Sequence, residues 1–171
     1  LDGLKTEVGE SAEIVNAQGV TLTDNRSWWD DEVNLIDPEQ NMRDIGIAVS
    51  IAKGADLVIL AIGGDESTSR EAWSETHMGD RNDITLFGQQ KELVDAIGQL
   101  DIPTVGVVIS GRPLALTNVE DNLDAILYGW ILGQETGTAV ADILFGKVNP
   151  SGKMPVTVPR TVGQIPAFYY H

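Results

Sequence analysis

The sequence predicts an α/β fold, a three-layer α/β/α sandwich built on a mostly parallel sheet. Three continuous apolar runs carry this prediction, at residues 56–64, 104–110 and 124–130. Apolar runs of this length without polar alternation are typical of strands that are buried on both faces of a parallel sheet. Segments of about 10 to 16 residues with helical periodicity lie between and after them, as expected where helices connect parallel strands.

The first part of the chain has the pattern of a short helix at residues 2–9 and a strand-like stretch at Glu13–Ala17. Sheets of this class normally open on a strand. We therefore expect the sandwich to be missing its first strand, and a segment upstream of Leu1 to have been removed. In the polar segment that follows, Trp28 and Trp29 could form a sugar platform, although packing of the loop onto the core is the safer interpretation.

The helical segments are marked by their boundaries and by apolar spacing. Residues 38–53 begin with Pro38 at a favoured first-turn position behind Asp37 as a cap, and Gly54 marks the end of the segment. Residues 89–100 and 135–145 repeat apolar side chains every three or four positions. The proline-rich tail after residue 149 is predicted to form an edge strand and irregular structure. In the first segment the recurring apolar side chains are Met42, Ile45, Val49 and Ala52. In the second, Leu93, Ala96, Ile97 and Leu100 share one face, and in the third, Val140, Ile143 and Leu144 are expected to point inward.

Length and charge limit the classes of function. The 171 residues suit one domain, which we place at residues 1–171, with no internal repeat or linker. No apolar run approaches the roughly 18 residues needed to cross a bilayer. A net charge of −15 disfavours nucleic-acid binding, since such a surface repels phosphates. The absence of cysteine excludes disulfides and thiolate sites. It does not fix the compartment, for which a periplasmic or secreted location is slightly favoured.

A long loop between the first two apolar runs is the candidate functional region. It lies between Ile62 and Thr85 and has no convincing helix or strand pattern. Its sequence is GGDESTSREAWSETHMGDRND. Ligands bind open α/β sheets beyond the carboxyl ends of the strands, and a loop this long inside a domain is often functional. Carboxylates interleaved with Trp73 suit sugar recognition, because carboxylates bind hydroxyls and an indole covers the C–H face of a pyranose. A solvated acidic loop is the plainer alternative.

Within this loop, Glu71 has the surroundings that a general acid for glycoside cleavage needs. Such an acid must keep its proton near neutral pH, which requires partial burial or acidic neighbours. Trp73 lies two residues from Glu71 and Glu75 four residues away. Other chemistries fit less well. Gly63-Gly64 lacks the spacing of a phosphate-binding turn. His77 with Asp80 has no second histidine nearby for a metal, and Ser67, Ser69 and Ser110 lie outside any nucleophile elbow.

Several motifs in order resemble a known family. They read SREAW, GDRNDITL, SGRPLAL, DAILYGWILGQETGTAVADILFG and NPSGKMPVTVPRTVGQIP. From about Asp56 to the end, and more weakly back to Leu1, the chain resembles the second domain of glycoside hydrolase family 3. That family contains β-glucosidases, β-xylosidases and exo-β-glucanases. The resemblance implies an N-terminal barrel domain that supplies an aspartate nucleophile, a glutamate acid/base from a sandwich loop, and no cofactor or metal. The reaction would retain configuration through a covalent glycosyl-enzyme intermediate.

The resemblance leaves two glutamates as the acid/base. SREAW aligns with an S-G-E-G-Y-like pattern and selects Glu71, whereas a Y-T-E-T-x-G-D-like pattern aligns with residues 74–76 and selects Glu75. Each alignment needs a gap, and Glu71 is favoured. Arg70, Trp73 and His77 would then line the aglycone side as substrate-binding residues or orient the acid.

The other matched motifs are expected to be architectural. Gly111-Arg112-Pro113 resembles a strand-to-helix turn, with the arginine available for carbonyls or an acid. Glu135 would start a helix and complement its dipole, and residues 149–159 would pack at the edge of the sheet. The expected function is the acid/base domain of a retaining exo-acting β-glycosidase, acting as a β-glucosidase on an oligosaccharide or β-glycoside. The alternatives are a β-xylosidase or a non-catalytic carbohydrate-binding or interaction module when isolated.

Overall fold

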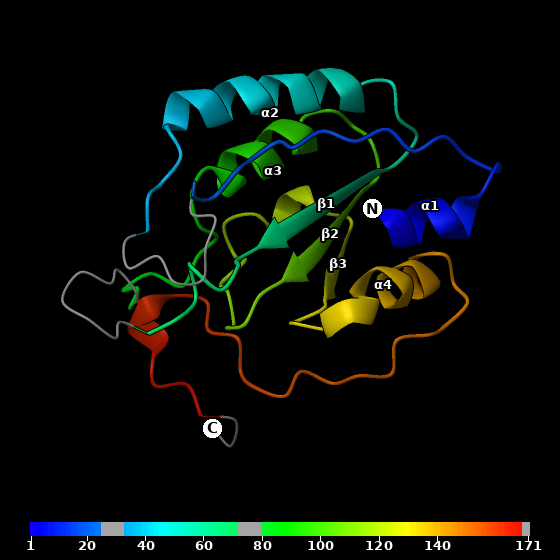
Figure 1. Ribbon diagram of the computed structural model, residues 1–171. Coiled ribbons are helices and arrows are strands. Elements are labelled where there is room, and N and C mark those ends of the chain that lie inside the picture. Colours follow the sequence, from blue (N-terminus) through cyan, green and yellow to red (C-terminus); the bar gives the residue numbers. More distant parts are fainter. Residues whose placement is uncertain (25–32, 72–79, 169–171) are drawn as a thin grey trace.

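The computed structural model describes residues 1–24, 33–71 and 80–168. Four α-helices and three strands form the framework in these parts of the chain (Figure 1). Short 3₁₀ turns at residues 120–122, 133–135 and 162–164 connect them. The framework elements are α1 (Asp2–Val8), α2 (Pro38–Ala52), β1 (Val58–Gly63), α3 (Gln90–Gly98), β2 (Thr104–Ile109), β3 (Ala125–Tyr128) and α4 (Thr136–Leu144).

The three strands form one parallel sheet in the order β1-β2-β3. Val58 pairs with Thr104 at one end of β1, and Gly63 pairs with Ile109 at the other. Helices α2 and α3 cover one face of the sheet, and α1 and α4 lie together on the other side (Figure 1). The predicted α/β sandwich with a parallel sheet is therefore confirmed. All three strands end at the same edge, from which the candidate loop departs.

The main core lies between the sheet and the α2–α3 layer. Val94 and Val108 are fully buried there, and Ile97 is 2% exposed. Burial of each such side chain contributes about 1.5–3 kcal/mol of hydrophobic free energy, which fixes the helices against the strands. The other buried members of this cluster are Ile45, Ala52, Leu60, Ile62, Leu86, Leu93, Leu114, Leu116 and Val119.

The predicted helices all form, and their ends follow the expected local chemistry. The Asp37 carboxylate accepts a hydrogen bond from the Glu39 N–H and caps α2, whose first residue is Pro38. On α3, Leu93 and Ile97 are buried, with Ala96 and Leu100 packed partly against the same cluster. On α4, Val140 and Ala141 are the buried positions. Ala141 thus takes the place expected for Ile143 and Leu144, which are only half-buried.

The short helix α1 packs against α4 through two glycines. A Cβ atom added to Gly3 would lie 2.2 Å from the carbonyl oxygen of Gly137, so only glycine allows the two backbones to approach this closely. An ion pair between Lys147 and Glu7 joins the same two regions at the surface. The hydrogen bond from Lys147 to Glu7 raises the pKa of the lysine.

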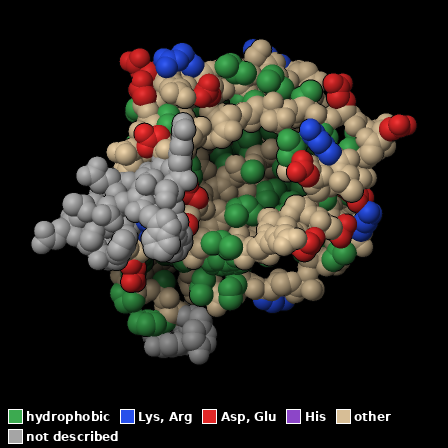
Figure 2. All heavy atoms as spheres, viewed as in Figure 1, with side chains coloured by type: hydrophobic (Ala, Val, Ile, Leu, Met, Phe, Trp, Pro, Cys, Tyr) green, Lys and Arg blue, Asp and Glu red, His purple; other side chains and the backbone are tan. Residues whose placement is uncertain are grey.

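The strand predicted at Glu13–Ala17 was wrong. Residues 13–17 have no strand assignment, and residues 14–17 instead line an apolar groove of about 310 Å³ beside β1, an edge strand of the sheet within the described chain. Leu57 and Ile59 also line this groove. Hydrophobic side chains line a hollow on the face of the molecule drawn in Figure 2. A strand needs a neighbouring backbone for its ladder, and here the groove separates this segment from β1. The expectation of a missing first strand stays a prediction.

Two further expectations need correction. The third strand was predicted to be buried, but Ala125 and Ile126 are exposed because β3 is an edge of the sheet within the described chain. The edge strand predicted in the tail does not form in residues 146–168, which hold only a 3₁₀ turn at residues 162–164. Prolines remove ladder donors there, which favours irregular structure. No helix in the described parts of the chain has the length and apolar character to cross a membrane.

Candidate functional site

The candidate loop leaves β1 at Gly63 and returns to the framework at the start of α3. The backbone of Gly63 has φ 138°, and a Cβ atom there would lie 1.9 Å from the Ile109 carbonyl oxygen. The buried Gln90 side chain holds both ends of the loop. It accepts a hydrogen bond from the Gly63 N–H at 2.7 Å, and donates to the carbonyl oxygens of Gly63 at 2.7 Å and Phe87 at 2.8 Å. One amide therefore fixes the exit and the return of the loop.

The first arm of the loop, residues 64–71, is a turn organised by Asp65. Its carboxylate accepts hydrogen bonds from the Ser67 hydroxyl at 2.7 Å and the Thr68 N–H at 3.0 Å. The Thr68 hydroxyl, in turn, accepts from the Asp65 N–H at 3.1 Å. Backbone bonds from Ser69 and Arg70 to the Glu66 carbonyl complete the turn. These local bonds give the arm a defined shape up to the residue before Glu71.

Two of the predicted site residues lie in this arm. Glu71 is exposed at its end. The Arg70 side chain is only 12% exposed, and its guanidinium lies 3.5 Å from a carboxylate oxygen of Glu66. The other predicted site residues, Trp73, Glu75 and His77, lie outside the described residues, as do Trp28 and Trp29.

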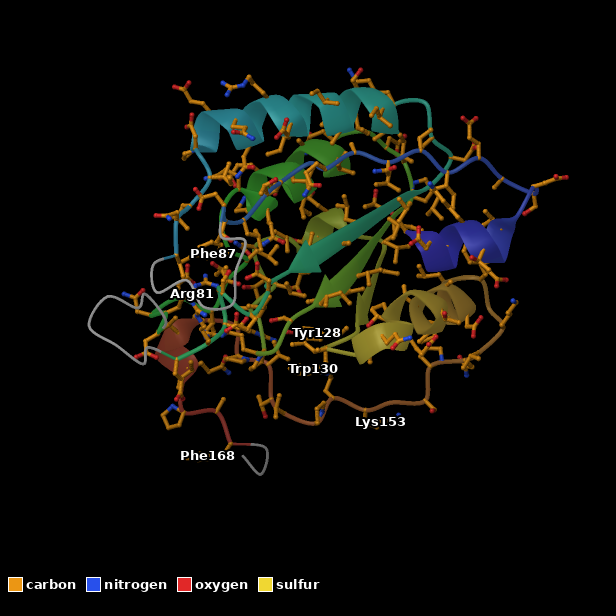
Figure 3. The ribbon with its side chains drawn as sticks, in the orientation of Figure 1. Arg81, Phe87, Tyr128, Trp130, Lys153 and Phe168 are labelled. Carbon is orange, nitrogen blue, oxygen red and sulfur yellow. The ribbon has the colours of Figure 1, made fainter. Side chains whose placement is uncertain are left out.

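The second arm, residues 80–88, is held by a cation–π contact and an aspartate turn. The Arg81 guanidinium lies over the Phe87 ring, 4.7 Å from its centroid (Figure 3). Burial lowers the pKa of Arg81, with the nearby Asp83 carboxylate opposing and the Arg112 charge adding to this effect. Hydrogen bonds from the Thr85 N–H and hydroxyl, both at 2.9 Å, hold the pKa of Asp83 below its ordinary value, as does the Arg81 charge.

A cavity of about 730 Å³ lies between the two arms. Both arms contribute to its walls, through Ser67 and Thr68 on the first and residues 80–88 on the second. Val33 and Leu35 add an apolar wall, and other polar side chains complete the lining. Its volume lies within the range of small-molecule sites. Arg70 and Glu71 do not line it.

The ends of β2 and β3 form a hydrogen-bonded support beside the first arm. The Ser110 hydroxyl, with no exposed surface, donates to the Arg112 carbonyl oxygen at 2.9 Å and accepts from the Arg112 N–H at 3.2 Å. The Tyr128 hydroxyl donates to the same carbonyl at 3.0 Å and accepts from the Leu114 N–H at 2.8 Å. Burial raises the pKa of Tyr128, with the Leu114 bond opposing.

This support reaches the loop directly. The Arg112 guanidinium donates to the carbonyl oxygen of Ser69, two residues before Glu71. Of the two kinds of partner expected for Arg112, a carbonyl or an acid, this hydrogen bond is to a carbonyl. Next to Tyr128, Trp130 adopts a left-handed backbone with φ 53°, and the two rings lie 4.6 Å apart between centroids (Figure 3).

Sequence reasoning missed Gln90, Tyr128 and the role of Ser110. Each is a polar side chain inside or at the end of an apolar element, and this position was the one sign in the sequence that these residues make specific hydrogen bonds. A buried polar group must find a partner, but the sequence does not say which. Among the described residues, no group of three or more His, Asp or Glu side chains is arranged to hold a metal ion.

Comparison with known proteins places this arrangement in a family. The model of the glycosyl hydrolase family 3 C-terminal domain matches residues 1–171. A periplasmic β-glucosidase of Salmonella typhimurium is 40% identical over 176 residues, covering 100% of this chain and 22% of the relative. A β-xylosidase of Formosa agariphila is 40% identical over 169 residues, covering 99% of this chain and 20% of the relative.

Solved structures agree with the sequence relatives. A β-glucosidase from Erythrobacter marinus superposes with a TM-score of 0.93 at 40% identity, covering 99% of this chain and 24% of that one. A β-glucosidase from Listeria innocua, solved with glucose, gives a TM-score of 0.66 at 34% identity over 75% of this chain and 17% of that one. The chain spans about a fifth of the length of the curated relatives named above. The match over the full chain, together with the fold, shows that it belongs to the glycosyl hydrolase family 3 C-terminal domain family.

Proposed function

We propose that this chain is the acid/base domain of a retaining, exo-acting β-glucosidase, and that Glu71 is the acid/base. The observation that carries the proposal is the position of Glu71. In a chain of this family, it lies exposed at the end of an ordered turn that leaves the carboxyl end of a parallel strand. This is the edge at which open α/β sheets bind ligands. The partial burial that a general acid needs would then come from a second domain that closes over this turn.

The chemistry requires a second carboxylate. In retaining glycosidases, one carboxyl group protonates the leaving oxygen while a second, about 5–5.5 Å away, attacks the anomeric carbon and forms a covalent intermediate. We assign the second group to an N-terminal barrel domain. The relatives are about five times as long as this chain, which leaves room for such a domain. Glu71 would then act as general base on water in the second step.

Glucose is proposed as the terminal sugar, and xylose is the second candidate. Relatives with β-glucosidase names include the Salmonella protein and the Erythrobacter structure, both 40% identical to the chain. The Formosa relative named β-xylosidase is equally similar, which keeps the second candidate open. The ratio of kcat/KM for aryl β-glucoside and aryl β-xyloside in the full-length enzyme decides between them. A ratio below one would reverse the assignment.

The test of the acid/base is Glu71→Gln in the full-length enzyme. We expect kcat/KM for a β-glucoside with a poor leaving group to fall about 100- to 10,000-fold, because general acid catalysis is lost. With a dinitrophenyl leaving group, which needs no proton, kcat/KM should change less than about threefold. Azide should restore turnover in Glu71→Ala and give a β-glucosyl azide.

The matched control is the same pair of substitutions at Glu75. If Glu75→Gln shows the leaving-group dependence and Glu71→Gln does not, then Glu75 is the acid/base and the proposal for Glu71 is wrong. If neither variant shows it, the acid/base does not come from these two positions.

A further inference from the structure

We infer that Arg112 is a positioning residue for the acid/base, because it fixes the turn that carries Glu71 to the end of the neighbouring strand. The inference rests on the proposed role of Glu71. Arg112 is not placed in contact with substrate. It is proposed to act through the carbonyl group of Ser69.

The first step is that hydrogen bonds fix the backbone of Arg112 at both its N–H and its carbonyl group. Its N–H and carbonyl groups both bond to the hydroxyl of Ser110, which is completely buried at the end of β2. The same carbonyl accepts a second hydrogen bond from Tyr128 on β3, at 3.0 Å. Two strands therefore define the position of the Arg112 backbone, which limits the directions that its side chain can take.

The second step is where the guanidinium goes. It donates to the Ser69 carbonyl oxygen across 43 positions of sequence. Hydrogen bonds with one charged partner contribute more to stability than neutral ones. Gly111, next to Arg112, also lies close to this bond, since a Cβ atom on Gly111 would be in ordinary van der Waals contact with the Ser69 Cβ, at 4.0 Å. The arginine thus ties the end of the first arm to β2.

The third step is the consequence for Glu71. The hydrogen bonds centred on Asp65 shape the turn internally, but they connect residues of the same turn. The bond from Arg112 sets where that turn lies relative to the sheet. Glu71 follows Ser69 by two residues and is exposed, so a small rotation of the turn would displace its carboxyl group. A displacement of about 1 Å is enough to cost about 100-fold in rate when a catalytic group must meet a reacting atom.

The experiment compares Arg112→Gln and Arg112→Lys in the full-length enzyme, with Arg43→Gln as the control. Arg43 is an exposed arginine on α2, outside the proposed site. We expect Arg112→Gln to lower kcat/KM for a poor leaving group about 10- to 100-fold, with less than about a twofold change for dinitrophenyl glucoside. Lysine keeps a charged donor and should recover part of the loss. The control should match the wild type with both substrates.

If Arg112 had a purely structural role, Arg112→Gln would lower kcat/KM for both substrates by the same factor, and that result would overturn the inference. So would an unchanged kcat/KM for the poor leaving group. If Arg112→Gln does not fold, Arg112→Lys and Tyr128→Phe test the same point. Tyr128→Phe removes the hydroxyl that donates to the Arg112 carbonyl and accepts from the Leu114 N–H, and it should show a smaller loss with the same leaving-group dependence.

The double variant Glu71→Gln/Arg112→Gln separates this inference from the proposed function. If Arg112 acts through Glu71, the double variant should be no slower than Glu71→Gln alone with the poor leaving group. Additive losses would show that Arg112 acts elsewhere. If Glu71→Gln alone shows no leaving-group dependence, it is the proposed function that fails. If Glu71→Gln shows this leaving-group dependence and Arg112→Gln does not, only the positioning inference fails.

Discussion

The two ends of the parallel sheet use polar side chains in different ways. At the amino end, the connections before β2 and β3 are short, and polar side chains of the connection before β3 bond to β2 and α3. The Asp124 carboxylate accepts from the Thr104 N–H at 2.7 Å, and the Asn122 amide donates to Asp95 at 3.0 Å. At the carboxyl end, the polar side chains bond to backbone groups of a loop of about twenty residues. Gln90 and Arg112 reach it from other elements.

The two ends differ in what these hydrogen bonds support. At the amino end, Asp124 and Asn122 join neighbouring framework elements to one another, which stabilises the fold. At the carboxyl end, the same kinds of hydrogen bond hold a segment that ends in an exposed glutamate. We therefore expect substitutions at the amino end to change stability only, and substitutions at the carboxyl end to change stability and activity together.

The largest expected effect is at Gly63, where the loop leaves β1. Alanine at this position would place a Cβ atom 1.9 Å from the Ile109 carbonyl oxygen, at a φ of 138° that side chains rarely adopt. Gly63→Ala should lower the free energy of unfolding by roughly 3–5 kcal/mol, because the backbone of two paired strands must move. Activity should fall as well, because the loop leaves β1 at this residue. The loss of stability is measured by thermal unfolding of the full-length enzyme, and the loss of activity by kcat/KM.

The control for this variant is Gly46→Ala on α2. A Cβ atom there meets nothing within 4 Å. Alanine in a helix is favoured over glycine by about 0.5–1 kcal/mol, so Gly46→Ala should raise the melting temperature slightly and leave activity unchanged. A Gly63→Ala variant as stable as the wild type would mean that the strand end tolerates a side chain.

A smaller effect is expected at Asp124, on the amino end. Asp124→Ala leaves the Thr104 N–H without its carboxylate partner, at a residue only 1% exposed. The expected loss is about 1–3 kcal/mol of unfolding free energy, with kcat/KM within about twofold of the wild type. Asp121→Ala on the adjacent exposed turn is the control and should change stability by less than about 0.5 kcal/mol. A large loss of activity in Asp124→Ala would contradict the distinction between the two ends.

The smallest expected effect is at Asp83, in the second arm of the loop. The Thr85 bonds and the Arg81 charge lower the pKa of this carboxyl group in the folded protein. Its stabilisation is therefore fully present above the ordinary aspartate pKa of about 3.9, and is lost as the pH falls through the lower folded value. Asp83→Asn should lower the melting temperature by only about 1 °C at pH 7, because the group is exposed and screened.

The measurement is a series of melting temperatures between pH 7 and pH 3 for the wild type and Asp83→Asn. The difference between them should be constant down to about pH 5 and shrink below about pH 4. A difference that grows as the pH falls would have the wrong sign. It would show that the carboxylate is disfavoured in the folded protein.

Several elements could be predicted because their signals are local. The capped start of α2 at Pro38 and the apolar run of β1 each lie within one short window of sequence. The strand expected at Glu13–Ala17 failed for a different reason. Its pattern was suitable, but a strand also needs a paired neighbour, and that segment lies across a groove from β1. The exposure of β3 was missed for a related reason. Its place at an edge of the described sheet depends on the order of all the strands, which the sequence of one strand does not give.

Local patterns in the sequence were enough to predict the class of fold, the loop that carries the candidate acid/base, and the resemblance to family 3. How that loop is held became visible only in the folded chain. Gln90 bonds to Gly63 across 27 positions, and Arg112 bonds to Ser69 across 43. Helix and strand propensity act between near neighbours and can be read from a window of residues. The partner of a buried polar group depends on which distant segments the packed core brings together.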